Sequence, residues 1–337
     1  MNIIILLLGF VLLVKGADIF VEGSSTIAKI LKIPPLIIGL TIVAFGTSAP
    51  EAAVSITAAI NGQNGMAMGN VVGSNIFNLL MVVGISGFIK NLSVDKAIIS
   101  KEFPFLILIS VLLFVLTIDV SLQGSLTNIL SRGDGLVLLM FFIIFMYSLL
   151  KSALNSMNNP SLEETSISFD SASIDYDNDI LTKEKTNSKV LIKNILASII
   201  GIILIILGGN MVVKGASNIA SFFGVSDQLI GLTIVSIGTS LPEFVTSIIA
   251  AIKGESSIAL GNVIGSNVFN ILFVLGASAT ISPMFIDPLL FIDTLFMIGI
   301  TTLTYLFSIR KKDINKIESS ILVLLYIGYM AYLLISA

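Results

Sequence analysis

The feature that most constrains this chain is a segment that occurs twice. Residues 39–80 and 231–272 align without a gap, and 26 of their 42 positions are identical. The offset is 192 residues throughout, so Glu51 corresponds to Glu243. Each copy is apolar, is interrupted by glycine and proline, and carries one carboxylate. A pair of such segments in a long apolar chain is typical of transporters whose binding site forms between internal repeats.

Composition places most of the chain in lipid. Of the 337 residues, 55% are hydrophobic and only 12% are charged, whereas soluble domains are about 25% charged. Apolar runs of roughly 20 residues recur along the chain, which is the length that spans a bilayer as a helix. In hydrocarbon every backbone amide needs an internal partner, so only helices or closed barrels are possible, and these runs are too continuously apolar for barrel strands. We predict an all-α polytopic membrane protein.

The hydrophobic runs predict ten transmembrane helices arranged as two repeats of five. Residues 1–151 form the first repeat and residues 189–337 the second. Residues 152–188, rich in Ser, Asn, Asp and Glu, are interpreted as a disordered linker. Pro50 and Pro242 lie in mid-span, where a proline removes a backbone hydrogen bond, so each helix is expected to break there.

An odd number of spans means that two homologous halves insert with opposite orientation. Cytoplasmic loops collect lysine and arginine, which tests the arrangement. With the N-terminus outside, 15 of the 18 basic residues fall in inside loops. We therefore expect inverted repeats in the cell (plasma or inner) membrane, with both termini outside and the linker in the cytoplasm.

The chain contains no cysteine and no histidine. This excludes disulfides, thiolate nucleophiles, imidazole proton relays and the usual zinc sites. The expected surroundings are the lipid bilayer, and the sequence indicates no cofactor, no nucleic-acid partner and no protein partner.

The polar residues of each duplicated segment fall on shared helix faces. Thr47 and Ser48 lie four and three residues before Glu51, so all three can share one helix face. Asn70, Ser74 and Asn78 are spaced by four and share a second face. Inverting one repeat against the other brings these faces together. We predict an all-oxygen cage of carboxylates, hydroxyls and amide carbonyls, with backbone carbonyls freed at the broken helices. The faces are Thr47, Ser48 and Glu51 with Asn70, Ser74 and Asn78, and Thr239, Ser240 and Glu243 with Asn262, Ser266 and Asn270.

Such a cage suits hard cations. Ca²⁺ takes about 6–8 oxygen ligands, Mg²⁺ dehydrates reluctantly, and transition metals prefer nitrogen or sulfur. Na⁺ also accepts hydroxyl and carbonyl oxygens, and two glutamates balance one Ca²⁺ or two Na⁺. A lone Ser or Asn in a span is ordinarily packing, but a mid-membrane glutamate costs about 3 kcal/mol, so a function is the default for Glu51 and Glu243.

The paired motifs GTSAPE with GSNIFN, and GTSLPE with GSNVFN, resemble those of the cation/calcium exchanger superfamily, and its prokaryotic sodium/calcium exchanger (antiporter) branch in particular. The resemblance covers essentially the whole chain. It implies ten helices and alternating access, with Na⁺ entry driving Ca²⁺ export. It also implies the ligands: Glu51 and Glu243 bridging Ca²⁺ and Na⁺, backbone carbonyls from Thr47 and Thr239, hydroxyls from Ser48, Ser74, Ser240 and Ser266, and main-chain oxygens of Ala44 and Ser236 for Na⁺.

The sequence departs from that pattern at Asn78 and Asn270, where family members often have aspartate. The cage therefore has two carboxylates, which disfavours an exchanger that also needs K⁺. Proton-coupled relatives usually carry a glutamate where this chain has Ser74-Asn75 and Ser266-Asn267. Our hypothesis is a Na⁺/Ca²⁺ antiporter in which a sliding or rocking helix pair opens the site to one side at a time. The alternative is a Ca²⁺ antiporter of the same superfamily coupled to H⁺ or to Na⁺ plus K⁺.

Two rival classes remain at this stage. The first is an intramembrane enzyme with Ser48 or Ser240 as nucleophile and Lys15 or Lys214 as base, although we expect no enzyme. The second is a channel.

Two smaller expectations concern charged residues. Asp18 is expected to form a structural ion pair with Lys15. The linker run IDYDNDI resembles the start of a calcium-binding loop but lacks the Gly and Glu that such a loop needs, having Ile180 and Thr186 at those positions.

Overall fold

The computed structural model describes residues 2–124, 126–158, 184–222, 236–286 and 289–336. Eight of the described helices are long and apolar enough to cross a membrane. A bent pair, Pro35–Thr47 with Ala49–Ile60, forms a further span with a 51° break. In the second half, the residues that align with the start of this span fall in 223–235, outside the described residues. The predicted helical membrane protein is confirmed.

The described elements follow a similar order in the two halves, although η3 and α8 of the first half have no counterpart among the described residues of the second. In the first half these are α1 (Asn2–Leu31), α2 (Pro35–Ile38), η1 (Gly39–Val43), α3 (Ala44–Thr47), α4 (Ala49–Ile60), α5 (Asn64–Phe77), η2 (Asn78–Val82), α6 (Val83–Ile89), β1 (Leu92–Ser93), η3 (Ile98–Glu102), α7 (Phe103–Leu116), α8 (Asp119–Gln123), β2 (Ile129–Leu130) and α9 (Arg132–Asn158). In the second half they are α10 (Glu184–Phe222), α12 (Ser236–Thr239), α13 (Leu241–Lys253), α14 (Ser256–Phe269), η7 (Asn270–Leu275), α15 (Gly276–Ile281), β3 (Met284–Phe285), α16 (Leu289–Lys311), β4 (Asp313–Ile314) and α17 (Lys316–Ser336).

The motif-bearing spans form the centre of the molecule. In an 18-residue window of the span 256–281, 94% of the residues are buried, and in one of the span 64–89, 72% are; the windows of the other candidate spans are 17–39% buried. Glycines of α14 allow the two repeats to approach closely. A Cβ at Gly265 would lie 2.7 Å from the main-chain oxygen of Leu40, and one at Gly261 would lie 2.9 Å from that of Leu36. These motif glycines therefore serve close helix packing, which places polar residues of both repeats at the centre.

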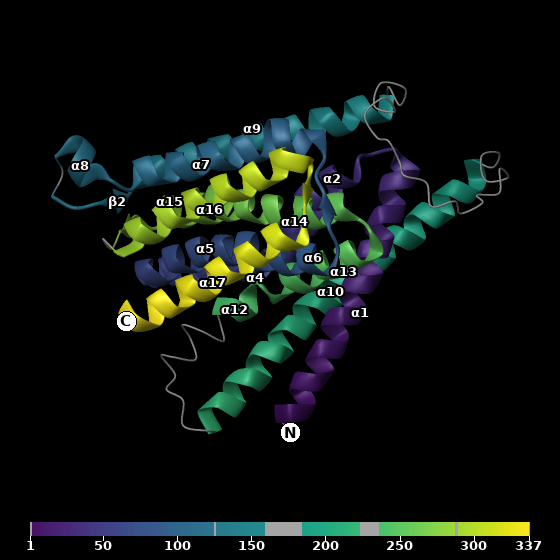
Figure 1. Cartoon of the computed structure of the whole chain (residues 1–337), viewed down its shortest axis with the longest axis horizontal. Coiled ribbons are helices and arrows are strands. Elements are labelled where there is room, and N and C mark those ends of the chain that lie inside the picture. The colour runs from purple at the N-terminus through teal and green to yellow at the C-terminus, as the bar shows by residue number, and fades with distance from the viewer. Residues whose placement is uncertain (1, 125, 159–183, 223–235, 287–288, 337) are drawn as a thin grey trace.

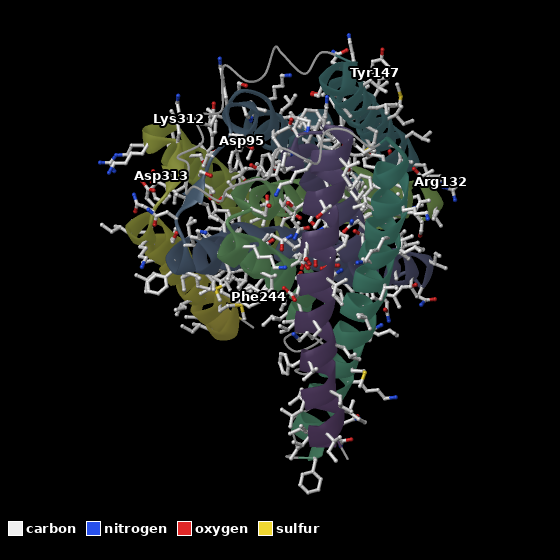
Figure 2. The ribbon with its side chains drawn as sticks, turned by 90° about the vertical axis from the view of Figure 1, so that its right-hand side faces the viewer. Asp95, Arg132, Tyr147, Phe244, Lys312 and Asp313 are labelled. Atoms are coloured by element: carbon white, nitrogen blue, oxygen red, sulfur yellow. The ribbon has the colours of Figure 1, made fainter. Side chains whose placement is uncertain are left out.

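Helices α1 and α10 lie side by side and project from the rest of the bundle (Figures 1 and 2). Their contact depends on small residues, because a Cβ at Gly16 would lie 2.9 Å from the main-chain oxygen of Gly201, and a Cβ at Gly201 would lie 2.9 Å from that of Gly16. Any side chain there would push the helices apart. The pair is thus a distinct packing unit on the flank of the other helices.

Two short antiparallel strand pairs join the two halves at their loops. Strand β1 pairs with β4, with Ser93 opposite Asp313, and β2 pairs with β3, with Leu130 opposite Met284. Lys312 and Asp313 lie near Asp95 in Figure 2. Each pair links one strand of the first half to one of the second, so the helices outside the α1–α10 pair are fastened together by backbone hydrogen bonds.

Several expectations change in detail. Helix α9 continues to Asn158 and α10 begins at Glu184, so helix occupies both ends of the predicted linker. The rest of that linker, including its IDYDNDI run, lies outside the described residues, and the division at 1–151, 152–188 and 189–337 stays a prediction. The expected Asp18–Lys15 pair is wrong as to partner: Asp18 Oδ1 lies 2.7 Å from Nζ of Lys253, the last residue of α13.

Candidate cation site

The two glutamates sit at helix breaks. Ser48 separates α3 from α4 with φ −84° and ψ 7°, and Ser240 separates α12 from α13 with φ −89° and ψ 5°. A proline follows in the first turn of each second helix, and so does the glutamate, Glu51 or Glu243. The predicted breaks are therefore confirmed. They place each carboxylate near a helix N-terminus, where the helix dipole favours negative charge.

Each carboxylate is held by a serine of the opposite repeat. Ser48 Oγ donates to Glu243 Oε1 at 2.7 Å, and Ser240 Oγ donates to Glu51 Oε1 at 2.9 Å. All four side chains are fully buried. Each carboxylate is thereby bonded to the serine at the helix break that precedes the other glutamate. The geometry thus brings together the pair that the aligned repeats predict.

A second layer of asparagines supports the broken helices in both repeats. Asn70 Nδ2 donates to Ser55 Oγ at 2.9 Å and approaches the main-chain oxygen of Glu51 at 3.4 Å. Its Oδ1 accepts from Thr239 of the other repeat at 3.5 Å. The matching contacts in the second repeat are Asn262 to Ser247 at 2.9 Å, Asn262 to the oxygen of Glu243 at 3.3 Å, and Thr47 to Asn262 at 3.0 Å.

Four amides form a network between the central helices. Asn78 Nδ2 donates to Asn267 Oδ1 at 3.1 Å, and Asn270 Nδ2 donates to Asn75 Oδ1 at 3.2 Å. Asn267 Nδ2 donates to the main-chain oxygen of Asn75 at 3.3 Å, and Asn75 Nδ2 donates to that of Asn267 at 3.4 Å. Every bond has its counterpart in the other repeat, as expected for inverted copies. Asn78 and Asn270 also begin the π-helical turns η2 and η7, a feature often found at functional sites.

Four carboxylate and amide oxygens in this region are buried without a hydrogen-bond partner: Oε2 of Glu51, Oε2 of Glu243, Oδ1 of Asn78 and Oδ1 of Asn270. The hydroxyl oxygen of Ser266 is also buried without one. An unpaired buried acceptor is costly, and each such group calls for an explanation. Oxygens of carboxylates and amides are ligands that Ca²⁺ accepts. No third acidic residue joins the two glutamates to form a larger acidic cluster within the described ranges.

The remaining predicted residues fall in or next to this network. Ser74 Oγ lies 3.0 Å from Ser240 Oγ, and Ser266 lies beside Glu243. The main-chain oxygen of Ala44 already accepts from the Ser48 N–H at 2.9 Å and lies 3.3 Å from the Thr47 hydroxyl. The side chain of Ser236 lies outside the described residues.

Four residues of this network were not predicted as site residues. They are Ser55, Asn75 and their counterparts Ser247 and Asn267. All four are identical between the repeats, and that identity was the available signal. They were missed because they contact other protein groups, whereas the prediction sought cation ligands.

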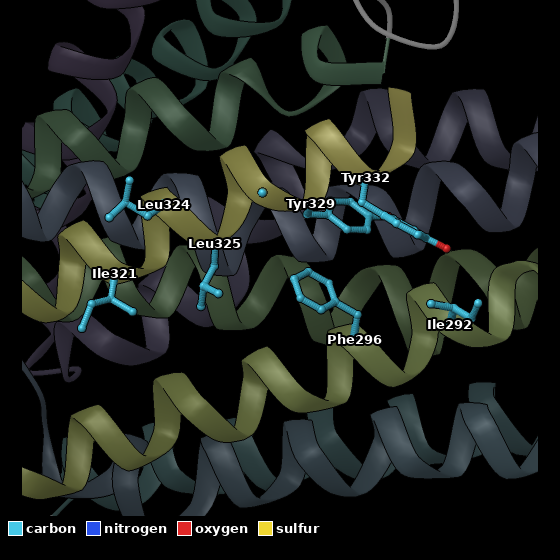
Figure 3. Close-up of a pocket in the computed structure, with 8 residues that line it drawn as sticks. Ile292, Phe296, Ile321, Leu324, Leu325, Tyr329 and Tyr332 are labelled. Carbon is cyan, nitrogen blue, oxygen red and sulfur yellow. The ribbon is translucent and has the colours of Figure 1, made fainter. Parts of the chain in front are cut away.

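The serines are not arranged as an enzyme nucleophile would be. Both hydroxyls donate to glutamates, whereas Lys15 and Lys214 are exposed on α1 and α10. A groove of about 500 Å³ opens between α16 and α17 (Figure 3). Its lining is apolar and aromatic and includes no residue of the cation site: Ile292, Phe296, Ile321, Leu324, Leu325, Gly328, Tyr329 and Tyr332.

A buried, symmetric oxygen cluster between inverted membrane repeats defines the class of secondary transporters that carry ions. Comparison with known proteins specifies the family. The family model for sodium/calcium exchanger proteins matches residues 1–151 and 193–335, so the chain belongs to the sodium/calcium exchanger family.

Relatives and solved structures agree with this assignment. The putative antiporter CaxA of Alkalimonas amylolytica is 40% identical over 99% of this chain and 98% of its own length. The sodium/calcium exchanger MaX1 of Methanosarcina acetivorans is 32% identical over 98% of both chains. The structure of the sodium-calcium exchanger NCX_Mj soaked with Na⁺ and no Ca²⁺ aligns over 98% of both chains with a TM-score of 0.80 and 31% identity. The chain therefore has the ten-helix inverted-repeat fold of a multi-pass membrane exchanger.

Proposed function

We propose that the chain exchanges Ca²⁺ for Na⁺ across the membrane, with the ions bound between Glu51 and Glu243 near the bilayer midplane. The observation that carries this proposal is the cluster of four buried carboxylate and amide oxygens without partners, which includes one carboxylate oxygen of each glutamate. Two carboxylates balance one Ca²⁺ or two Na⁺. The same negative charge can therefore be neutralised by either ion, which is the condition for competition at overlapping sites.

The unfavourable energy of a site without cations would couple Na⁺ movement to Ca²⁺ movement. Two buried carboxylates without cations are unfavourable in a low-dielectric interior. A closed, empty site is therefore disfavoured, so the transporter changes sides with cations bound. Both glutamates are fully buried in the structure, which distinguishes this site from the open pore of a channel.

The proposed ligands are the residues that the repeats align around this cluster. Glu51, Glu243, Asn78 and Asn270 would contribute side-chain oxygens that have no other partner. Hydroxyls of the neighbouring serines would join when an ion replaces their present acceptors. The set comprises Ser48, Ser74, Ser240 and Ser266, with main-chain oxygens of Thr47, Thr239, Ala44 and Ser236.

The distribution of lysines supports the proposed orientation. The C-terminal part of α9, with Lys151, and the N-terminal part of α10, with Lys189 and Lys193, lie on the same side of the bundle (Figure 1). We place this side in the cytoplasm and both termini outside, in the plasma or inner membrane. Because the chain has no cysteine, a membrane-impermeant thiol reagent on intact cells tests this. A cysteine introduced at position 335 should be labelled, and one introduced at position 170 should not.

The decisive experiment measures ⁴⁵Ca²⁺ uptake by proteoliposomes under separately imposed Na⁺, K⁺ and pH gradients. We expect uptake only with an outward Na⁺ gradient. Uptake driven by a pH gradient, or a requirement for K⁺ beside Na⁺, would favour the alternative coupling. Glu51→Gln and Glu243→Gln should each abolish uptake, because they remove one of the two charges. Glu102→Gln, at a glutamate that is also buried, is the matched control and should retain it.

A further inference from the structure

The four buried amides between the central helices, Asn75, Asn78, Asn267 and Asn270, have side chains whose orientation matters. An asparagine side chain has an oxygen end and an NH₂ end of nearly the same shape. Rotating it by 180° exchanges a cation acceptor for a donor that repels a cation. The orientation of Asn78 and Asn270 therefore decides whether the proposed cation site gains an oxygen from each, and neighbouring hydrogen bonds determine that orientation.

The orientation of Asn78 is anchored in a group that cannot rotate. The main-chain oxygen of Asn75 accepts from Asn267 Nδ2 at 3.3 Å. This contact requires the NH₂ end of Asn267, so Asn267 Oδ1 faces the other way and accepts from Asn78 Nδ2 at 3.1 Å. The NH₂ end of Asn78 is thereby engaged, and its Oδ1 is left buried without a partner.

The other repeat contains the same sequence of contacts. The main-chain oxygen of Asn267 accepts from Asn75 Nδ2 at 3.4 Å, and Asn75 Oδ1 accepts from Asn270 Nδ2 at 3.2 Å. Oδ1 of Asn270 is again buried without a partner. Each repeat thus orients an amide of the other. The unpaired Oδ1 atoms of Asn78 and Asn270 are each connected, through two hydrogen bonds, to a main-chain oxygen that cannot rotate.

We propose that Asn75 and Asn267 are positioning residues: Asn267 orients the Asn78 amide, and Asn75 orients the Asn270 amide, so that both carbonyl oxygens are presented to Ca²⁺. The inference deepens the proposed function and rests on it. Asn75 and Asn267 touch no cation themselves, since their own oxygens are occupied by the amides they orient.

Equilibrium ⁴⁵Ca²⁺ binding to the purified full-length chain in detergent, without Na⁺, tests this. Leucine has nearly the shape of asparagine but no acceptor. We expect Asn267→Leu and Asn75→Leu each to raise the Ca²⁺ dissociation constant about tenfold, the effect of losing one charge-assisted contact. Binding unchanged in both variants would overturn the proposal. Failure of the wild-type chain to bind Ca²⁺ would instead remove the proposed function.

Suppression separates positioning from a merely structural role. Aspartate has two equivalent oxygens and no NH₂ group, so its orientation needs no acceptor. The added carboxylate itself tightens Ca²⁺ binding, so each defect is measured relative to the aspartate single variant. In the Asn78→Asp background, Asn267→Leu should cause no further loss, whereas Asn75→Leu should keep its tenfold effect. Asn270→Asp should do the reverse. Defects that persist equally in both aspartate backgrounds, or that both backgrounds suppress equally, would contradict the proposed pairing.

A conservative variant covers the case in which the leucine variants do not fold, as judged by thermal unfolding. Asn267→Asp keeps the oxygen that accepts from Asn78 and replaces the NH₂ group with a second oxygen, which faces the main-chain oxygen of Asn75. It should bind Ca²⁺ within about threefold of wild type or more tightly, because the orienting acceptor remains. A tenfold loss in this variant would overturn the proposal.

Discussion

Ser48 of the first repeat donates a 2.7 Å hydrogen bond to the carboxylate of Glu243 in the second. The mirrored bond runs from Ser240 to Glu51 at 2.9 Å. Because each glutamate is held by the other repeat, neither half contains a complete site. Relative movement of the two broken helices would change both carboxylate environments at once.

The serine–glutamate bonds give the first prediction. Ser48→Ala removes a hydrogen bond to a charged group, which contributes about 1.5–3 kcal/mol. We expect the half-saturating Ca²⁺ concentration for Na⁺-dependent uptake to rise about tenfold to a hundredfold. Ser240→Ala should have the same effect, since its bond is equivalent. Ser100→Ala, at an exposed serine bonded only to its own helix, should leave uptake unchanged. A normal Ca²⁺ dependence in both site variants would show that the serines do not hold the carboxylates in the working cycle.

The site could be predicted from the sequence to the extent that the repeats align. An offset of 192 residues maps Ser48 onto Ser240 and Glu51 onto Glu243, and inversion then requires that they meet. The amide network could not be predicted, because it depends on which end of each asparagine faces its neighbour. The partner of Asp18 was missed for a similar reason. Lys15 is one turn away on the same helix, whereas Lys253 is brought close only by the tertiary fold.

The strand pairs and the helix ends could not be predicted from the sequence either. Two-residue strands such as β1 and β4 produce no alternating pattern long enough to recognise. The polar stretch after residue 151 resembles a linker by composition, yet α9 continues to Asn158. A polar composition indicates that a segment can lie in water. Because the polar end of a helix can lie in water as well as a loop can, composition does not show where the helix ends.

The contact of α1 with α10 gives the second prediction. A Cβ at Gly16 would lie 2.8 Å from the backbone nitrogen of Ile205 and 2.9 Å from the oxygen of Gly201, neither of which can yield easily. Gly16→Val should therefore destabilise the packing by about 1–3 kcal/mol, measured as a lower thermal unfolding midpoint of the purified chain. Gly299→Ala, where nothing lies within 4 Å, should leave the midpoint unchanged or raise it slightly. An unaltered midpoint in Gly16→Val would mean that the helices are less tightly apposed.

Charged contacts in the C-terminal half of α1 give the third prediction. Lys253 Nζ lies 2.7 Å from Asp18 Oδ1 and 3.6 Å from Glu22 Oε2, and Ser25 donates to Glu255 at 2.5 Å. The positions aligned with Lys253 and Glu255 in the first repeat are Asn61 and Gln63, and Asp18 aligns with Asn210 of α10. The repeat-related position of α10 therefore lacks the equivalent charges, and the ion pairs are particular to α1.

Replacing that lysine with its repeat counterpart tests the attachment. Lys253→Asn should weaken it by about 1 kcal/mol, the usual range for partly exposed ion pairs. A cysteine at position 24, where the wild-type serine is 1% exposed, should then react with a thiol reagent about two to five times faster. Lys311→Asn, at an exposed lysine ending α16, is the control. Equal labelling rates in the two variants would show that the ion pairs do not hold α1 in place.

The last prediction distinguishes the moving parts. If a sliding or rocking helix pair opens the site, α1 must change its contacts with α13, while the strand pairs that join the halves stay intact. The absence of native cysteine allows a matched comparison. Ser93→Cys with Asp313→Cys lies across β1–β4, where facing residues are close enough for a disulfide. Asp18→Cys with Lys253→Cys joins α1 to the end of α13 through a short thiol-specific cross-linker.

Both double variants should transport Ca²⁺ when their thiols are reduced. Oxidising the strand pair should leave Na⁺-dependent ⁴⁵Ca²⁺ uptake nearly unchanged, because this bond lies within one rigid unit. Cross-linking α1 to α13 should stop uptake while equilibrium Ca²⁺ binding persists, since the site remains formed but its access to one side is blocked. Full uptake after α1 is cross-linked would exclude movement of this helix from the cycle. Loss of uptake after β1 is joined to β4 would instead place the movement between the two halves themselves.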